Sequence, residues 1–230
     1  MAFFLSLSGY HNAGKTTLGT FLVSELKKKN YKIAVIKSCK LTEDIIDNNP
    51  AKDTWKYKAL GIEKVILFQK EFFTLFQKNS IQDQKLLYHF FLSFFWKEDF
   101  VLFEGFKNFS LISKIWIVKD EKEADEILKI KSQLRNLIGF VVKKKETINW
   151  LEDNFKYKAF LWEEKEKLLN FVEQEIEKHK EKVLLFVNDK LIPMNHFVAD
   201  VLKYPILGFL KTLKNVPENI NFVEIKLKLS

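Results

Sequence analysis

The sequence has almost no cysteine and no long uncharged apolar run, and each absence excludes a class of protein. Cys39 is the only cysteine, so no disulfide can form within the chain, and this is typical of a reducing compartment. The first residues lack the basic segment, apolar stretch and small-residue cleavage site of a secretory leader. No apolar run reaches membrane-spanning length without charges. We therefore expect a soluble, cytoplasmic protein with no membrane partner.

Arginine is also scarce, since Arg135 is the only one in the chain. The formal net charge of +8 therefore comes from lysine, which alternates with glutamate along the helical segments as on solvated helix faces. The strongest basic clusters, Lys27–Lys29 and Lys143–Lys145, lie in no nucleic-acid-binding motif. We expect no nucleic-acid partner.

The chain is rich in apolar residues, which make up 47% of its 230 residues and include 23 phenylalanines. This is enough for one large domain, or for one domain with a small appendage. Because the phenylalanines fall mostly inside apolar runs, we interpret them as core residues. The run at residues 90–96 is too short to span a membrane, and we expect it to be a buried helix end.

Residues 9–16 form the motif that carries the most chemistry. They read Gly-Tyr-His-Asn-Ala-Gly-Lys-Thr, which fits the phosphate-loop pattern Gly-x4-Gly-Lys-Ser/Thr. A strand is expected before the motif at residues 2–8 and a helix after it at residues 15–29. Glycines let such a loop turn its N–H groups toward a phosphate, and the helix adds the positive end of its dipole. The predicted nucleotide contacts are Gly9, Tyr10, His11, Asn12, Ala13, Gly14, Lys15 and Thr16.

The last two residues of this motif have expected roles in binding. Lys15 reaches the β- and γ-phosphates of a bound nucleotide, and the hydroxyl of Thr16 binds Mg²⁺. Residues 100–103 then form an apolar run that leads into Glu104, and nucleotide hydrolases hold Mg²⁺ through such a carboxylate. Glu104 is therefore the predicted second metal residue, with Asp99 as a weaker candidate and a capping carboxylate as the structural alternative. We assign the catalytic roles to Lys15 and Glu104.

Strands and helices alternate along the first two-thirds of the chain, which predicts an α/β fold of the P-loop NTPase type, with a mainly parallel sheet covered by helices on both faces. Further strands are predicted at residues 32–37, 64–69, 99–104, 113–119 and 136–142, and further helices at 51–60, 82–97, 121–132 and 163–180. Ligands of such sheets bind at the carboxyl ends of the strands. The phosphate loop, Lys37 and Glu104 all fall at such ends.

The pattern changes near residue 181, so we divide the chain into a nucleotide-binding domain at residues 1–180 and a small C-terminal α+β module at residues 181–230. In the module we expect a β-hairpin at 183–193, a helix from His196 to Leu213 that starts at an Asn195 N-cap, and a final strand at 220–229. Pro205 is expected to kink this helix or divide it into two short ones.

A polar stretch follows the predicted strand at residues 32–37 and is expected to form a mobile loop over the site. Lys37 and Lys52 are candidates to neutralise phosphate, and Asp47 and Asp53 are candidates to hold metal or position water. An ordinary solvated loop is the alternative for each residue. We interpret Cys39 as a packing residue rather than a reactive thiol.

Taken together and in this order, four segments resemble the molybdopterin-guanine dinucleotide biosynthesis protein B (MobB) family over roughly residues 1–175. The segments are Gly9 to Thr17, Val35-Ile36-Lys37, Pro50 to Thr54 with Ala59-Leu60-Gly61, and Val101 to Lys107. The chain departs from the family where histidines usually follow the lysine at position 37, since Ser38, Cys39, Lys40 and Leu41 stand there.

The resemblance implies a homodimer that binds GTP with Mg²⁺, hydrolyses it slowly and assists the guanylyltransferase of molybdenum cofactor maturation. It adds Thr17 to the predicted phosphate contacts and supports Glu104 as the acidic residue. GTP rests on the resemblance alone, because the chain has no Asn-Lys-x-Asp guanine signature. The alternatives are a small-molecule kinase or ligase with the same loop, and a partner-binding module that the nucleotide switches.

Overall fold

The computed structural model describes residues 1–38, 60, 64–68, 73–77, 81–131, 134–179, 183–188, 190–220 and 222–227. It divides the chain into two compact units. One unit consists of Met1–Lys37 together with Gln84–Ser230, and the other is Ser38–Asp83. Within the second unit, β3 (Lys64–Phe68) and β4 (Phe73–Gln77) pair as an antiparallel two-stranded sheet.

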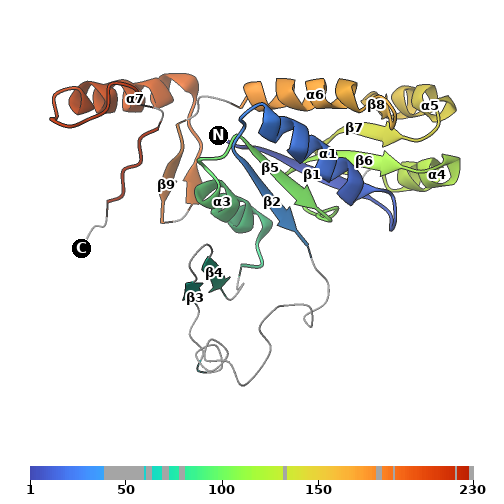
Figure 1. Cartoon of the computed structure of the whole chain (residues 1–230), viewed down its shortest axis with the longest axis horizontal. Helices are drawn as coiled ribbons and strands as arrows, with labels where there is room; N and C mark the ends of the chain where they lie inside the picture. The colour runs from blue at the N-terminus through green and yellow to red at the C-terminus, as the bar shows by residue number, and fades with distance from the viewer. Residues whose placement is uncertain are drawn as a thin grey trace. The chain divides into compact units, whose positions relative to one another are not determined.

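The first unit is built on a six-stranded sheet with strand order β2-β5-β1-β6-β7-β8 (Figure 1). All neighbouring strands in it are parallel. The strands are β1 (Phe3–Gly9), β2 (Ile33–Lys37), β5 (Phe100–Glu104), β6 (Ser113–Val118), β7 (Leu137–Val142) and β8 (Lys158–Leu161). Parallel sheets are covered on both faces, which explains the nearly continuous apolar runs of the central strands.

Helices cover both faces of this sheet (Figure 1). On one face α1 (Lys15–Lys28) and α6 (Lys165–Glu177) bury leucines against Leu5 and Leu7 of β1. On the other face α3 (Gln84–Phe94) packs against Phe4, and α4 (Glu121–Lys129) and α5 (Glu146–Phe155) pack against β6 and β7. Alternate residues of β1 therefore supply two separate cores, as the strand period of two requires.

Lys114 is a buried cation within the sheet, with a side chain that is 1% exposed. Its ammonium group donates hydrogen bonds to the backbone carbonyls of Phe109, Ile112 and Arg135. Burial lowers the pKa of Lys114 to about 8, because desolvation disfavours the charged form. The lysine thus ties the turn before β6 to the turn before β7.

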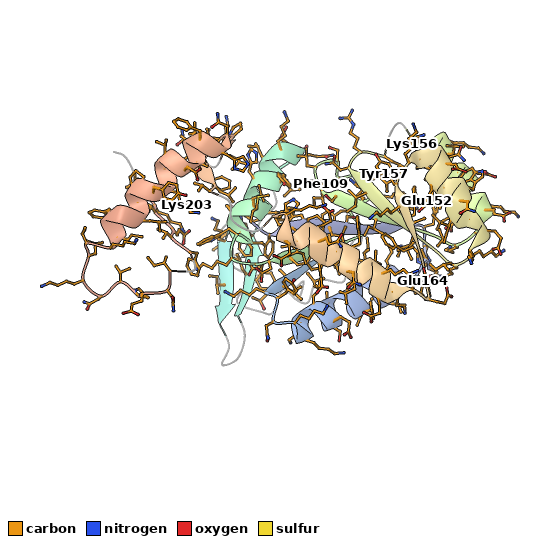
Figure 2. The ribbon with its side chains drawn as sticks, turned by 90° about the horizontal axis from the view of Figure 1, so that it is seen from above. Phe109, Glu152, Lys156, Tyr157, Glu164 and Lys203 are labelled. Carbon is orange, nitrogen blue, oxygen red and sulfur yellow. The ribbon has the colours of Figure 1, made fainter. Side chains whose placement is uncertain are left out.

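The C-terminal part of the first unit consists of a hairpin and one helix. Strands β9 (Leu185–Val187) and β10 (Lys190–Ile192) pair antiparallel, and the N–H of Leu191 donates to Nδ1 of His89 on α3 at 3.1 Å. Helix α7 (His196–Leu210) begins at Asn195, whose side chain accepts a hydrogen bond from the N–H of Val198. None of its residues is buried, and Figure 2 shows their side chains, including that of Lys203, projecting around the helix.

The predicted fold class is confirmed, and most of the predicted elements are present. Within the described residues, three elements are found that the sequence pattern did not predict, namely β4, α5 and β8. The strand predicted at residues 64–69 exists as β3, but it pairs with β4 rather than joining the six-stranded sheet. The helix predicted at 51–60 lies outside the described residues apart from Leu60.

Two expectations in the apolar segments are wrong, and one of the two alternatives for α7 is excluded. Residues 220 and 222–227 have no regular secondary structure where a final strand was expected. Helix α7 continues across Pro205, so it is not divided into two. The hydrogen bond that proline cannot make would end at Val201, a residue that is 52% exposed. The end of α3 is not wholly buried either, because Phe94 is 55% exposed while Leu92 is buried.

Candidate functional site

The segment between β1 and α1 has the backbone of a tight anion-binding loop. Gly9 has φ +151° and Gly14 has φ +95°, and Gly14 is the N-cap of α1. A Cβ at Gly9 would lie 2.9 Å from the carbonyl oxygen of Ile117, so a larger residue would push β1 and β6 apart. Asn12 is also left-handed, at φ +57°. The glycines of the motif therefore stand where the backbone needs them.

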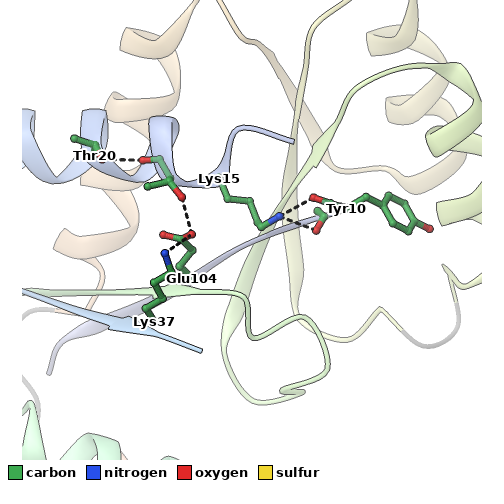
Figure 3. A network of polar contacts seen from close by, with 7 residues as sticks. Tyr10, Lys15, Thr20, Lys37 and Glu104 are labelled. Carbon is green, nitrogen blue, oxygen red and sulfur yellow. Dashed lines mark hydrogen bonds and ion pairs between the residues drawn. The ribbon is translucent and has the colours of Figure 1, made fainter. Parts of the chain in front are cut away.

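Lys15 points back into the loop from the first turn of α1 (Figure 3). Its ammonium group donates hydrogen bonds to the carbonyl oxygens of Gly9 at 3.1 Å and Tyr10 at 2.6 Å. Burial lowers the pKa of Lys15, and the opposing attraction of Glu104 raises it by a smaller amount. The ammonium is thus held inside the loop, where a phosphate bound by the loop would meet it.

Glu104 stands at the end of β5 and contacts both the residue after the loop lysine and the end of the neighbouring strand β2, as Figure 3 shows. Its Oε1 accepts a hydrogen bond from the hydroxyl of Thr16 at 2.7 Å and lies 3.8 Å from the Nζ of Lys37. The sheet register explains this meeting, because Glu104 is directly opposite both Lys37 on β2 and Leu7 on β1. Parallel strands that end at one level thus bring three predicted site residues together.

The Thr16 and Glu104 oxygens have the chemistry that Mg²⁺ requires. Mg²⁺ prefers oxygen ligands and keeps several waters, so one hydroxyl and one carboxylate beside a phosphate are a sufficient protein contribution. The Glu104 side chain is 16% exposed, which leaves its carboxylate within reach of solvent and ligand. Among the described residues there is no group of three or more His, Cys, Asp or Glu side chains that could hold a metal by themselves. The residues present therefore fit a metal that arrives with a phosphate.

Two aromatic side chains, those of Tyr10 and Trp162, make packing contacts between the phosphate loop and the part of the sheet formed by β6, β7 and β8. The ring of Tyr10 packs edge-on against Trp116 at a centroid distance of 6.1 Å, and Glu126 on α4 lies close enough to its hydroxyl to act on it. Burial and this carboxylate raise the pKa of Tyr10. Trp162, which follows β8, lies against Gly14, where an added Cβ would be 2.6 Å from its Cη2. Sequence reasoning missed Trp162 because the strand before it was not predicted.

The other predicted site residues lie apart from this group or outside the described chain. Asp99 accepts a hydrogen bond from the N–H of Lys32 at 2.8 Å and stands before β5, at the opposite edge of the sheet from Glu104. Asp99 therefore lies away from the phosphate loop, and its hydrogen bond joins the starts of β5 and β2. His11 and Thr17 are exposed at the loop. The candidates Asp47, Lys52 and Asp53, together with Cys39, lie outside the described residues.

Residues 4–143 match the family model described as molybdopterin guanine dinucleotide synthesis protein B, or MobB. That range contains the phosphate loop, Lys37 and Glu104, and it covers more than half of the chain. The chain belongs to the MobB family. The family binds nucleotides and takes part in molybdenum cofactor synthesis. Among curated proteins, no sequence matches the chain significantly.

Solved MobB structures share the fold of this chain. A MobB homologue from Bacillus stearothermophilus is 15% identical with a TM-score of 0.53, and the match covers 76% of this chain and 98% of the homologue. A molybdopterin-guanine biosynthesis protein B is 22% identical with a TM-score of 0.55, over 75% and 98% of the two chains. Bacillus subtilis MobB is 18% identical with a TM-score of 0.54, again over 75% and 98%. In the described part of this chain, no helix is long and apolar enough to cross a membrane.

Proposed function

We propose that this MobB protein binds GTP with Mg²⁺ at the phosphate loop, hydrolyses it slowly, and assists the guanylyltransferase that completes the molybdenum cofactor. The observation that carries the proposal is the joining of three segments at one sheet edge. Lys15 is held inside the loop, and the Thr16 hydroxyl and the Glu104 carboxylate meet beside it at 2.7 Å. The choice of guanine is supported by the family description, which names a guanine dinucleotide.

Each residue then has a definite part in binding. The loop backbone and the amino end of α1 bind the phosphate oxygens, and Lys15 neutralises the charge on the β- and γ-phosphates. Thr16 and Glu104 hold Mg²⁺, which would neutralise phosphate charge and orient the terminal phosphate. Lys37, with its side chain 68% exposed, is free to turn from Glu104 toward the terminal phosphate.

Slow hydrolysis follows from the groups that surround the terminal phosphate. An arginine placed near it raises turnover by ~10³–10⁵, but Arg135 precedes β7, at the edge of the sheet away from the loop, where its carbonyl accepts from Lys114. Lys119 and Lys107 are the further cations whose charges act on Lys15. We therefore propose that the protein holds its nucleotide for a partner enzyme, with little turnover alone. The resemblance to the family leads us to propose in addition a homodimer of the cytoplasm.

Calorimetry with Mg²⁺ and GTP, GDP or ATP tests the nucleotide part of this proposal. Lys15→Ala removes the ammonium inside the loop, and charge-assisted contacts to phosphate of ~1.5–3 kcal/mol predict a loss of affinity of at least ~10-fold. Lys28→Ala is the matched control on the same helix, because Lys28 pairs with Glu25 at 2.6 Å at the opposite helix end. Equal affinity of the wild type and Lys15→Ala would refute the proposed phosphate site. Tighter binding of ATP than of GTP would refute guanine as the preferred base.

A second measurement tests the part that concerns the partner. Single-turnover hydrolysis is followed with and without the guanylyltransferase, and its binding is measured by analytical ultracentrifugation. We expect complex formation and slow GTP cleavage in the absence of the partner. Fast cleavage that depends on a small hydroxyl or carboxyl acceptor would instead support a kinase or ligase.

A further inference from the structure

The indole ring of Trp162 stands beside the phosphate loop, on the side away from Glu104. The edge of its six-membered ring faces Gly14, the N-cap of α1. The backbone N–H of Trp162 donates to the carbonyl oxygen of Val142 at 2.7 Å, which fixes the start of the turn after β8 against the end of β7. The residue is only partly buried. An aromatic surface therefore borders the same loop that is proposed to hold the phosphates.

Two lysines lie over this ring. The Nζ of Lys165 is 5.1 Å from the ring centroid and the Nζ of Lys143 is 5.4 Å from it. Lys165 also lies 5.6 Å from the ring of Phe21 on α1, whereas Lys143 is exposed. Because these ammonium groups reach the indole face, another group can reach it too. Cations and flat aromatic rings both interact favourably with the π-electrons of such a face. The ring is thus accessible, and its surroundings attract anionic ligands.

The strand order gives the site two chemically different ends. Glu104 and Lys37 belong to β5 and β2, on one side of β1, whereas Lys143 and Trp162 follow β7 and β8, on the other side. A nucleotide also has two different ends, a charged phosphate chain and a flat base. A metal-binding carboxylate at one end and an aromatic ring at the other match these two ends in one orientation only.

From this we infer that Trp162 is the stacking platform for the purine base of the nucleotide, with Lys143 giving way to the base and Lys165 keeping the ring in place. The inference rests on the proposed nucleotide function and adds the direction in which the nucleotide lies. The terminal phosphate points toward β5 and the base toward β8. Packing against α1 and α6 explains the buried part of Trp162, and the base would cover the part that the lysines now reach.

The test separates the contribution of the base from that of the phosphates. Calorimetry with Mg²⁺ compares GTP and ATP with inorganic tripolyphosphate, which lacks a base. Trp162→Ala is expected to weaken both nucleotides by ~5- to 150-fold, the range of base–aromatic stacking, and to change tripolyphosphate affinity by less than ~2-fold. Trp162→Phe keeps an aromatic face and is expected to restore most of the loss, and thermal unfolding verifies that each variant is folded.

Trp96→Ala is the matched control, since Trp96 also carries a lysine, Lys97, at 5.3 Å from its ring but precedes β5 at the other edge of the sheet. It should leave all three affinities unchanged. Equal losses for tripolyphosphate and nucleotides, or no loss for either nucleotide, would overturn the role of Trp162 while leaving the phosphate site intact. If the wild type binds neither tripolyphosphate nor nucleotide, the proposed function itself fails, and the stacking role fails with it.

Discussion

Strand β5 and helix α7 are both strongly apolar, but β5 is buried and α7 is exposed to solvent. Residues 100–103 of β5 are at most 2% exposed, whereas Phe197 and Phe209 of α7 are 75% and 62% exposed. The strand has a neighbour on each edge and a helix on each face, and α7 has no buried residue at all. Apolar content therefore does not make a core unless another element covers it. The candidate site stands on the covered part of the molecule, which holds its residues in fixed positions.

The largest effect that tests this comparison comes from a pair of phenylalanines. Phe103→Ala should lower the free energy of unfolding by ~3–5 kcal/mol, because Phe103 is fully buried among the rings of Phe4, Phe91 and Phe106. Phe209→Ala should change it by less than ~0.5 kcal/mol. Urea unfolding of both variants measures the difference. A comparable loss for Phe209→Ala would mean that α7 is covered in solution, and dependence on protein concentration would identify a second copy as the cover.

Alanine substitutions at two glycines should change the stability of the protein in opposite directions. Gly14→Ala puts a side chain on a left-handed residue and against the ring of Trp162, so we expect a loss of ~1–3 kcal/mol in stability together with weaker nucleotide binding. Gly208→Ala, within α7, meets nothing within 4 Å and should stabilise by up to ~1 kcal/mol through helix propensity. Thermal unfolding of the two variants checks both signs. A stable Gly14→Ala protein with normal affinity would contradict the loop geometry.

A pair of lysines should differ in the pH dependence of stability. The pKa of buried Lys114 is lowered to about 8, so above that pH the folded protein has lost a proton that the unfolded chain holds up to about 10.5. The free energy of unfolding of the wild type should therefore rise by about 2 kcal/mol from pH 7 to pH 10 relative to Lys114→Met. The control is Lys203→Met on α7, a helix with no buried residue, and it should not reproduce the difference seen with Lys114→Met. Parallel curves for the wild type and Lys114→Met in urea would contradict a neutral buried amine.

The smallest effect is expected from removing α7. A chain that ends after Met194 loses α7 and the residues after it, which are exposed or partly buried wherever they are described, together with the ring contact of Phe222 with Trp96 at 5.0 Å. Its free energy of unfolding should fall by less than ~1 kcal/mol. Its affinity for nucleotide should stay within ~2-fold, while the hairpin stays bound to α3 through Leu191 and His89. Calorimetry and urea unfolding check both values. Loss of nucleotide binding would show that the C-terminal part contributes to the site.

The sheet was predictable where the chain itself carries the pattern. Strands β2 and β5 are nearly continuous apolar runs and β1 is broken only by serines. The ends of parallel strands must meet at one edge, which is why Glu104, Lys37 and the loop were expected together. The hydrogen bond between Thr16 and Glu104 confirms that the two residues meet, and their metal-binding role stays a prediction.

What was missed or wrong depends on partners that the sequence does not show. Strand β8 is four residues long and begins with a lysine, so its pattern is too short to separate from a loop. Residues 220–229 have the composition of a strand, but the described residues among them pair with no other strand. Trp162 belongs to no motif, and its place beside Gly14 follows only from the order of the strands.

The two carbonyl contacts of Lys15 also affect which anions the loop can select. Its ammonium is already partly removed from water and satisfied by Gly9 and Tyr10, so an incoming anion must displace two neutral acceptors before it gains the charge. A small, weakly charged ion such as chloride or acetate gains little from that exchange. A chain of phosphates gains more, since it meets the loop amides and the helix end in the same step. In the protein without nucleotide, the carbonyl groups of Gly9 and Tyr10 should therefore weaken the binding of small anions at Lys15.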